Sequence, residues 1–212
     1  MQVKKFVFNP FQENTYVVFD ETQEAVIIDP GCYESFEEKE LFDFIDQNQL
    51  TVKHLLNTHC HIDHVLGNQA VAKKYSLTPK IHQKDLVTLE SVDSYCHLYG
   101  FNNYKSSPKP EFIDENDTIE FGNSEFKILF GPGHCPGHIA FYSEKEHFMI
   151  SGDILFQGSF GRVDLPGGDF HTLKDSILNT FFKLPDETIV FCGHGPETSI
   201  GIEKASNPMN HL

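Results

Sequence analysis

The stretch Thr58-His59-Cys60-His61-Ile62-Asp63-His64 decides the fold of this chain. It follows an apolar run, Val52–Leu56, which predicts a buried strand that ends directly before the polar loop. Three imidazoles and a carboxylate are costly to bury side by side, because buried polar groups need partners. Imidazole nitrogen and carboxylate oxygen are ligands that zinc and iron accept. The stretch therefore predicts a metal-binding loop at the end of a strand.

The composition excludes several classes of partner. The chain has 212 residues, so we expect one domain over residues 1–212 with a full core. Lys and Arg number 16 and Asp and Glu number 31, a formal charge of −15, which argues against nucleic acid and against an anionic membrane surface. No run approaches the ~18 apolar residues of a membrane span, and no signal-peptide pattern opens the chain. The five cysteines contain no CxxC and predict free thiols in the cytoplasm.

Short strands and helices alternate in both halves of the chain. The patterns predict strands at Val3–Phe8, Thr15–Phe19, Ala25–Asp29, Val52–Leu56, Lys80–His82, Thr118–Phe121, Phe126–Phe130, Ile139–Ser143, Phe148–Ser151 and Thr188–Cys192. They predict helices at about 36–48 after a capping box at Ser35–Glu38, at Asn68–Tyr75, Gln83–Tyr95 and Leu173–Leu184, and a short one ending near Ser206. Between them, Cys96–Pro110 is expected to be a long loop. Its Tyr99, Phe101 and Tyr104 either border a substrate groove or pack on the body of the protein. An α/β fold follows, with two sheets packed face to face and helices outside.

Three further ligand-type residues stand just past the ends of later strands: His134, Asp153 and His194. Together with the opening loop they make five histidines and two aspartates. That is too many for one tetrahedral zinc, and it suits two ions that share a carboxylate and a hydroxide. The sequence therefore predicts a two-metal hydrolytic site.

This constellation resembles the metallo-β-lactamase superfamily, whose HxHxDH motif is followed by separate His, Asp and His residues. The resemblance implies a four-layer αβ/βα sandwich of two mixed sheets, with the metals at one edge. By motif position, it implies a first ion held by His59, His61 and His134, a second held by Asp63, His64 and His194, and Asp153 as the bridge. It also implies that Asp63 orients the attacking hydroxide and that Asp29 orients a ligand imidazole.

Two segments narrow the resemblance to one group. Gly161–Asp169 and Gly193–Thr198 look like the glyoxalase II-like thioesterases (hydroxyacylglutathione hydrolases) in their compact form. This implies that a metal-bridging hydroxide hydrolyses a small-molecule thioester. It also implies two ions, expected to be zinc, with iron or a mixed iron and zinc pair as the alternative. Arg162 is a candidate for holding a substrate carboxylate, or else it forms an ion pair with Asp164 or Asp169.

Rival functions remain for the same motif. A persulfide dioxygenase of the superfamily would hold one iron with His59, His134 and Asp153. The negative charge disfavours a nuclease, and the cysteine pattern disfavours an exported β-lactamase. A non-catalytic metal-stabilised protein would need only a closed set of four ligands. The other histidines are expected to be packing or surface residues, with His138 and His171 the candidates for bordering the site.

Overall fold

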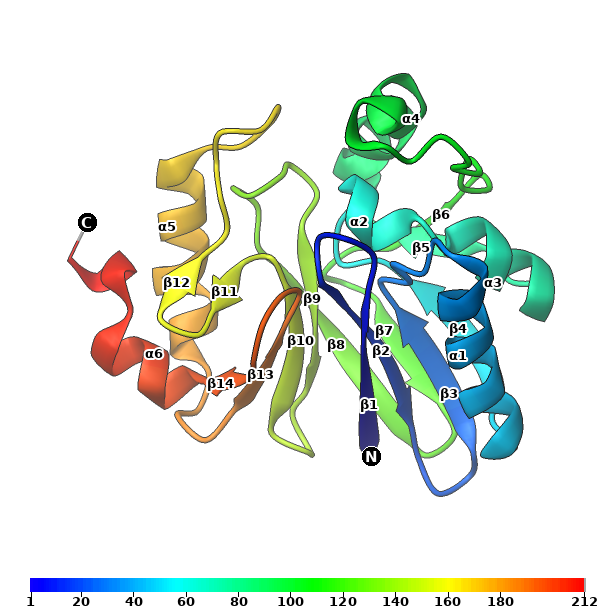
Figure 1. The fold of residues 1–212 in the computed structure, drawn as a ribbon. Helices are drawn as coiled ribbons and strands as arrows, with labels where there is room; N and C mark the ends of the chain where they lie inside the picture. Colours follow the sequence, from blue (N-terminus) through cyan, green and yellow to red (C-terminus); the bar gives the residue numbers. More distant parts are fainter. Residues whose placement is uncertain (212) are drawn as a thin grey trace. The chain divides into compact units, whose positions relative to one another are not determined.

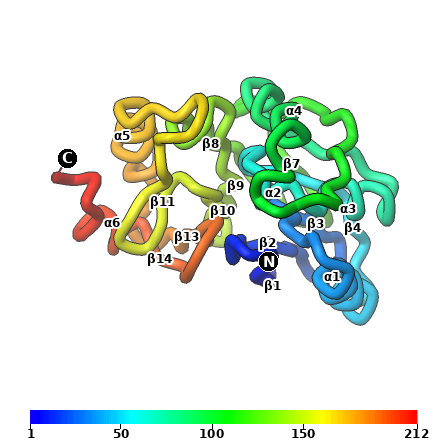
Figure 2. Tube along the Cα trace, turned by 45° about the horizontal axis from the view of Figure 1, so that its top comes forward, coloured from blue at the N-terminus to red at the C-terminus, as the bar shows by residue number. Residues whose placement is uncertain are grey.

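The computed structural model describes residues 1–211 and divides into two compact units. The first comprises Met1–Ile113 and Glu120–Ser124, and the second comprises residues 114–119 and 125 onward. Each unit has helices and a buried core of its own. The chain forms two six-stranded sheets, and Figures 1 and 2 show the course of their strands. The expectation of a single domain stays a prediction.

The first sheet has six strands in sequence order. They are β1 (Gln2–Phe8), β2 (Glu13–Phe19), β3 (Glu24–Ile28), β4 (Thr51–Leu56), β5 (Pro79–Ile81) and β6 (Glu111–Phe112). The pairs β1–β2 and β2–β3 are antiparallel, whereas β3–β4, β4–β5 and β5–β6 are parallel. The sheet is therefore mixed, and the carboxyl ends of β3 and β4 lie at the same edge.

The helices of the first unit are α1 (Ser35–Gln47), α2 (Ile62–Val65), α3 (Asn68–Tyr75), α4 (Leu86–Tyr95) and two single turns, η1 (Gln83–Asp85) and η2 (Cys96–Tyr99). In Figures 1 and 2, α1 and α3 run along one side of β3 and β4. Leu41 and Ile45 of α1, four residues apart, pack with Val71 of α3 and Leu55 of β4 in one core cluster. This cluster fixes the strands whose ends carry the polar loop.

The amino terminus of α1 differs from the predicted capping box. Glu34, rather than Ser35, is the N-cap residue, and its N–H donates to Oε2 of Glu37 at 2.9 Å. The other Glu37 oxygen accepts the N–H of Asn9 at 2.7 Å. Because that second partner lies 28 residues earlier in the chain, the local pattern does not contain it.

The second sheet also has six strands and is mixed. Its order is β14 (Thr198–Ser199), β13 (Ile189–Cys192), β10 (Phe148–Gly152), β9 (Ile139–Ser143), β8 (Ser124–Phe130) and β7 (Thr118–Phe121). The pair β10–β13 is parallel, and β8–β9 and β9–β10 are antiparallel. Consequently β8, β10 and β13 run in the same direction, and their carboxyl ends all lie at one edge of this sheet.

Helices and a small hairpin complete the second unit. They are β11 (Leu155–Phe156), β12 (Ser159–Phe160), α5 (Phe170–Asn179), η3 (Phe181–Lys183), α6 (Ile200–Ser206) and η4 (Pro208–Asn210). The helix α5 begins at Phe170 rather than at the predicted Leu173, because Asp169 caps it by accepting the N–H of Thr172 at 2.7 Å. Leu173 and Ile177 of α5 pack with Met149 and Val190 of the sheet. Both α5 and α6 lie beside this sheet in Figure 1.

Candidate metal-binding site

The first unit gathers four predicted ligands in and directly before α2. The strand β4 ends at Leu56, and the chain then passes through Thr58 into a loop that α2 closes at Ile62–Val65. The rings of His59 and His61 have centroids 4.9 Å apart, and those of His59 and His64 have centroids 4.1 Å apart. His59 and His64 are almost fully buried. The short helix was not predicted, and it places the ring of His64 beside that of His59.

Asp29 lies beside this loop because β3 and β4 are parallel neighbours. Ile28 pairs with Leu56, and the Asp29 N–H donates to the Leu56 carbonyl at 2.9 Å. One Asp29 oxygen accepts the Thr58 N–H at 2.7 Å, and the other accepts the Thr58 hydroxyl at 2.5 Å. The second oxygen also lies 3.2 Å from Nδ1 of His64. The Asp29 backbone has φ 50°, a left-handed conformation that Asp tolerates better than most residues.

These contacts fix the tautomers of two imidazoles. A carboxylate only accepts, so Nδ1 of His64 donates to Asp29, and its Nε2 carries the lone pair that a metal needs. The Thr58 hydroxyl gives its proton to Asp29, so its oxygen accepts from Nδ1 of His59 at 3.1 Å. One ligand atom from each of Asp29, His59 and His64 lies within 4.8 Å of the others. Both Asp29 oxygens are already engaged by Thr58 and His64, which is compatible with the predicted orienting role, and that role stays a prediction.

Asp85 and Thr88, which no local sequence pattern indicated, also contribute to the hydrogen bonding around this loop. The Cys60 N–H donates to the buried Asp85 carboxylate, which also accepts the Thr88 hydroxyl at 2.9 Å. Burial, with the Asp85 carboxylate in addition, raises the pKa of the Cys60 thiol well above its ordinary value. A thiol that stays protonated is a poor metal ligand, so the environment of Cys60 disfavours metal binding by its sulfur.

Glu13 of β2 is completely buried near the same loop. Its Oε1 lies 3.9 Å from Nδ1 of His64. Burial raises the pKa of the Glu13 carboxyl well above its ordinary value, although the His64 imidazole opposes this shift. A carboxyl group in this position has no signature in the local sequence, because its burial arises only when β2 pairs beside β3.

The second unit brings the other three predicted ligands together at the edge where β8, β10 and β13 end. Oδ2 of Asp153 lies 3.6 Å from Nε2 of His134 and 3.5 Å from Nε2 of His194. The parallel pairing of Gly152 with Cys192 sets this proximity, and the Gly193 N–H donates to the Gly152 carbonyl at 2.8 Å. In the first unit, Oδ2 of Asp63 lies 3.7 Å from Nε2 of His64.

These three distances fit metal ligands. They exceed the ~3.2 Å limit of an ordinary hydrogen bond. Two ligand atoms, each about 2.1 Å from an ion and at a tetrahedral angle, lie about 3.4 Å apart. The donor atoms in each unit therefore have the spacing and the chemistry of ligands that share an ion.

His134 is oriented by the main chain that follows Asp153. Its Nδ1 donates to the Arg162 carbonyl at 2.7 Å, which leaves the lone pair on Nε2. Gly161 allows this approach, since a Cβ there would lie 1.9 Å from the Asp153 carbonyl oxygen and 3.0 Å from Nδ1 of His134. The Arg162 side chain forms two 2.7 Å hydrogen bonds with the Asp164 carboxylate, both groups being largely exposed. Its proposed contact with a substrate carboxylate stays a prediction.

His138 has a more specific position than the sequence indicated. It is completely buried, and its Nε2 accepts the main-chain N–H of Asp153 at 3.0 Å. Its Nδ1 lies 3.1 Å from the Ile139 carbonyl, to which it donates. His138 therefore holds the backbone of a predicted ligand, and only its spacing of four residues from His134 hinted at this.

Known proteins resemble the chain along almost its whole length. The family model of the metallo-beta-lactamase superfamily matches residues 8–194. Hydroxyacylglutathione hydrolase GloC of Haemophilus influenzae is 36% identical, and the match covers 98% of this chain and 97% of that protein. The crystal structure of BLEG-1 B3 metallo-beta-lactamase is 36% identical, with a TM-score of 0.88 over 98% of both chains. The structure of TTHA1623 in a di-iron-bound form is 37% identical, with a TM-score of 0.86 over 97% of this chain and 99% of the other.

These matches confirm the predicted α/β class and the metallo-β-lactamase fold, and they confirm the resemblance to hydroxyacylglutathione hydrolases. The histidine and aspartate clusters are metal-binding groups of the kind that this fold uses. Among residues 1–211, no helix is both long enough and apolar enough to cross a membrane. The chain belongs to the metallo-beta-lactamase superfamily.

Proposed function

We propose that the chain is a metal-dependent hydrolase that cleaves a small-molecule thioester into a carboxylic acid and a thiol. Its superfamily membership and its 36% identity to a hydroxyacylglutathione hydrolase over 98% of the chain support this reaction class. The observation that carries the proposal is the set of nitrogen–oxygen distances of 3.5 to 3.7 Å between paired histidines and aspartates in both units. Hydrogen-bonded pairs would lie closer, whereas ligands of a shared ion would not.

The seven predicted ligands would act as two sets. His59, His61 and His134 would hold one ion, and Asp63, His64 and His194 the other, with Asp153 between them. The tautomers of His59, His64 and His134, each with its Nδ1 proton donated to an oxygen, suit this assignment. Zinc is the proposed metal. Iron is the alternative, and the di-iron form of a 37% identical relative gives it weight.

When bound, the ions supply a water of lowered pKa and a Lewis acid for the thioester carbonyl oxygen. The chain's own residues then have three tasks. Asp29 and Thr58 fix the rings of His64 and His59. Asp63, whose side chain is 14% exposed, accepts a hydrogen bond from the attacking water and orients it. The departing thiolate is stable in water at neutral pH, so no protein acid is needed to expel it.

The remaining parts of the proposal concern the whole molecule. We propose that the two units act as one domain, since the family model spans residues of both. A single cooperative unfolding transition by calorimetry tests this. A cytoplasmic location is proposed from the five cysteines, all of them free thiols in the structure.

Metal analysis of the purified protein, paired with a substrate screen, tests the function. We expect about two ions per chain, and hydrolysis of S-acyl thiols that stops after chelation and returns when metal is restored. One iron per chain, oxygen uptake with a thiol persulfide and no thioester cleavage would support the persulfide dioxygenase instead.

A second candidate function is β-lactam hydrolysis, because a B3 metallo-beta-lactamase is as similar to this chain as the thioesterase relative is. The two activities separate in one assay series. A kcat/KM for a chromogenic cephalosporin above that for every S-acyl thiol would favour the β-lactamase.

A further inference from the structure

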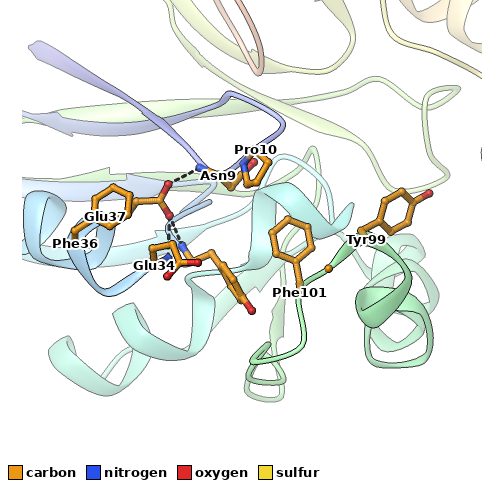
Figure 3. Close-up of a pocket in the computed structure, with 9 residues that line it drawn as sticks. Asn9, Pro10, Glu34, Phe36, Glu37, Tyr99 and Phe101 are labelled. Carbon is orange, nitrogen blue, oxygen red and sulfur yellow. Dashed lines mark hydrogen bonds between the residues drawn. The ribbon is translucent and has the colours of Figure 1, made fainter.

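The first unit has a groove of about 490 Å³ beside the amino terminus of α1, shown in Figure 3. Three segments line it: the turn after β1, the start of α1 and the end of η2. The lining residues are Asn9, Pro10, Tyr33, Glu34, Phe36, Glu37, Tyr99, Gly100 and Phe101. All of them belong to the same compact unit, so the groove is defined by contacts within that unit.

Aromatic rings form most of its wall. Phe101 is 2% exposed, and its ring centroid lies 4.9 Å from that of Tyr33, at an interplanar angle of 79°. The ring centroid of Phe11 lies 5.7 Å from that of Tyr99 and 5.8 Å from that of Phe101. At the rim, Tyr99 is 52% exposed and Phe36 is 67% exposed. The groove thus has a packed aromatic base and accessible ring faces.

The charge in the groove is negative. The two glutamates are its only ionisable side chains apart from the tyrosines, and the lining contains no Lys, Arg or His. Both Glu37 oxygens are engaged by main-chain N–H groups, those of Asn9 at 2.7 Å, Tyr33 at 2.8 Å and Glu34 at 2.9 Å. Glu34 is exposed at the rim. A carboxylate beside aromatic faces, on a chain of formal charge −15, attracts cations and repels anions.

Asn9 connects the groove to the metal-binding loop. Its side-chain amide donates to the Asp63 carbonyl at 3.1 Å and to the Gly31 carbonyl at 3.0 Å. The residue has φ 51°, a left-handed conformation, and its side-chain oxygen accepts the Phe11 N–H at 3.0 Å. The part of the groove that carries Asn9 is therefore hydrogen-bonded to the backbone of a predicted ligand.

We propose that this groove is a substrate subsite that binds a quaternary or primary ammonium group carried by the thioester. The inference rests on the proposed function for the reaction, but the ammonium binding itself does not depend on it. Ring faces contribute attraction to a cation at short range, and the Glu34 carboxylate adds to it. A polyanionic thiol such as a coenzyme A thioester is disfavoured by the same charges.

Three thioesters of one thiol, which differ only in the end group of the acyl chain, test the charge preference of the metal-loaded protein. Their acyl chains end in trimethylammonium, in the isosteric tert-butyl group, or in a carboxylate. We expect a kcat/KM about tenfold higher for the trimethylammonium chain than for the tert-butyl chain, and lower still for the carboxylate. Equal values for the first two, or a preference for tert-butyl, would overturn the proposal and indicate a simple apolar subsite.

Variants localise the effect. Glu34→Gln and Tyr99→Leu should each reduce the preference for trimethylammonium over tert-butyl to about threefold. The first removes the carboxylate charge, and the second removes a ring face and keeps an apolar side chain. Glu40→Gln is the matched control, since Glu40 is an exposed carboxylate on α1 outside the groove. If Glu40→Gln lowers the preference for trimethylammonium as much as Glu34→Gln does, the effect comes from the net charge of the protein. That result would overturn the proposed site.

A binding measurement separates this inference from the proposed function. The chain has no tryptophan, so Tyr99→Trp places a single tryptophan at the groove, and its fluorescence can be excited selectively. We expect saturable quenching by tetramethylammonium chloride, with none from sodium chloride at equal ionic strength. Saturable quenching without any thioester hydrolysis would reject the proposed function and keep the subsite. Thioester hydrolysis without charge preference or saturable quenching would support the proposed function and reject the subsite.

Discussion

The Nε2 of His138 accepts the main-chain N–H of Asp153 at 3.0 Å. His138 is itself completely buried, and its Nδ1 donates to a carbonyl, so the ring is held as one neutral tautomer. A predicted bridging carboxylate thus has its backbone fixed by an imidazole from the loop that also supplies His134. This arrangement makes His138 a positioning residue.

His138→Ala should lower metal affinity by about 10- to 100-fold, the usual cost of losing a group that orients a ligand. Competition with a chromogenic chelator measures this. His138→Gln, whose side-chain carbonyl can still accept an N–H, should recover part of the affinity, and His97→Ala, at an exposed position, should have no effect. Equal losses for the Ala and Gln variants would show that the ring acts only through packing.

Asp153→Ala should abolish most of the turnover and leave a folded protein, with kcat/KM lower by about 10³-fold or more. The variant loses the carboxylate that lies 3.5 and 3.6 Å from two ligand imidazoles. The kcat/KM and the metal content should both fall, while the circular dichroism spectrum stays unchanged. Asp175→Ala, an exposed aspartate on α5, is the control. Retained turnover in Asp153→Ala would refute the bridging assignment.

Two substitutions of Asp29 distinguish its orienting role from the strain of its left-handed backbone. Asp29→Asn tolerates φ 50° but removes the charge that faces Thr58 and His64, so metal affinity should fall about 10- to 100-fold. Asp29→Ala should lose the same affinity and, in addition, about 1–2 kcal/mol of stability from the left-handed backbone. Chelator competition and urea unfolding measure the two effects. An Asn variant with wild-type affinity would contradict the orienting role.

Glu203 of α6 stabilises the second unit. It is completely buried and accepts hydrogen bonds from the Gly158 N–H at 3.0 Å, the Thr198 hydroxyl at 2.6 Å and the Asn207 amide at 2.7 Å. Glu203→Ala should lower the free energy of unfolding by about 3 kcal/mol, because it leaves buried donors without an acceptor. Urea denaturation tests this against Glu187→Ala, an exposed glutamate. A loss no larger than that of the control would mean that water replaces the carboxylate.

Stability should decline in alkaline solution. Burial raises the pKa of the Cys192 thiol from about 9 to about 12, and it also raises the pKa of Tyr75. Above pH 9 the unfolded chain therefore releases protons that the folded chain retains, so the free energy of unfolding decreases as pH rises. For Cys192 alone the slope approaches about 1.4 kcal/mol per pH unit, and the contribution is complete near pH 12. Urea midpoints from pH 8 to about 11 should show a shallower decline for Cys192→Ala, and an unchanged slope would contradict this assignment.

The local pattern of this sequence was sufficient to predict most strands and the ligand types. Asn68–Tyr75, Thr118–Phe121 and Ile139–Ser143 begin and end where the apolar pattern predicts. These segments are amphipathic or continuously apolar, and short-range periodicity encodes both properties. The helix α2 was not predicted, because four residues of mixed polarity carry no helical period.

The ligands could be predicted for a related reason. Histidine and aspartate have few uses just after a buried strand, so their position and type together indicate metal binding. The parallel pairs β3–β4 and β10–β13 then explain why residues such as Asp153 and His194 meet within each unit.

The amino-acid sequence by itself thus determined the superfamily and the α/β fold class. It also predicts the donor atoms, because ligand chemistry is a property of residue type and local spacing. Only the tertiary structure decided how those donors are held. Asp29 reaches His64 from 35 residues away, and Arg162 reaches His134 from 28 residues away. It also decided the groove, which Asn9 and Phe101 both line although they are far apart in the chain. Such contacts arise when strands pair and loops pack, and no local period in a sequence records which distant segments become neighbours.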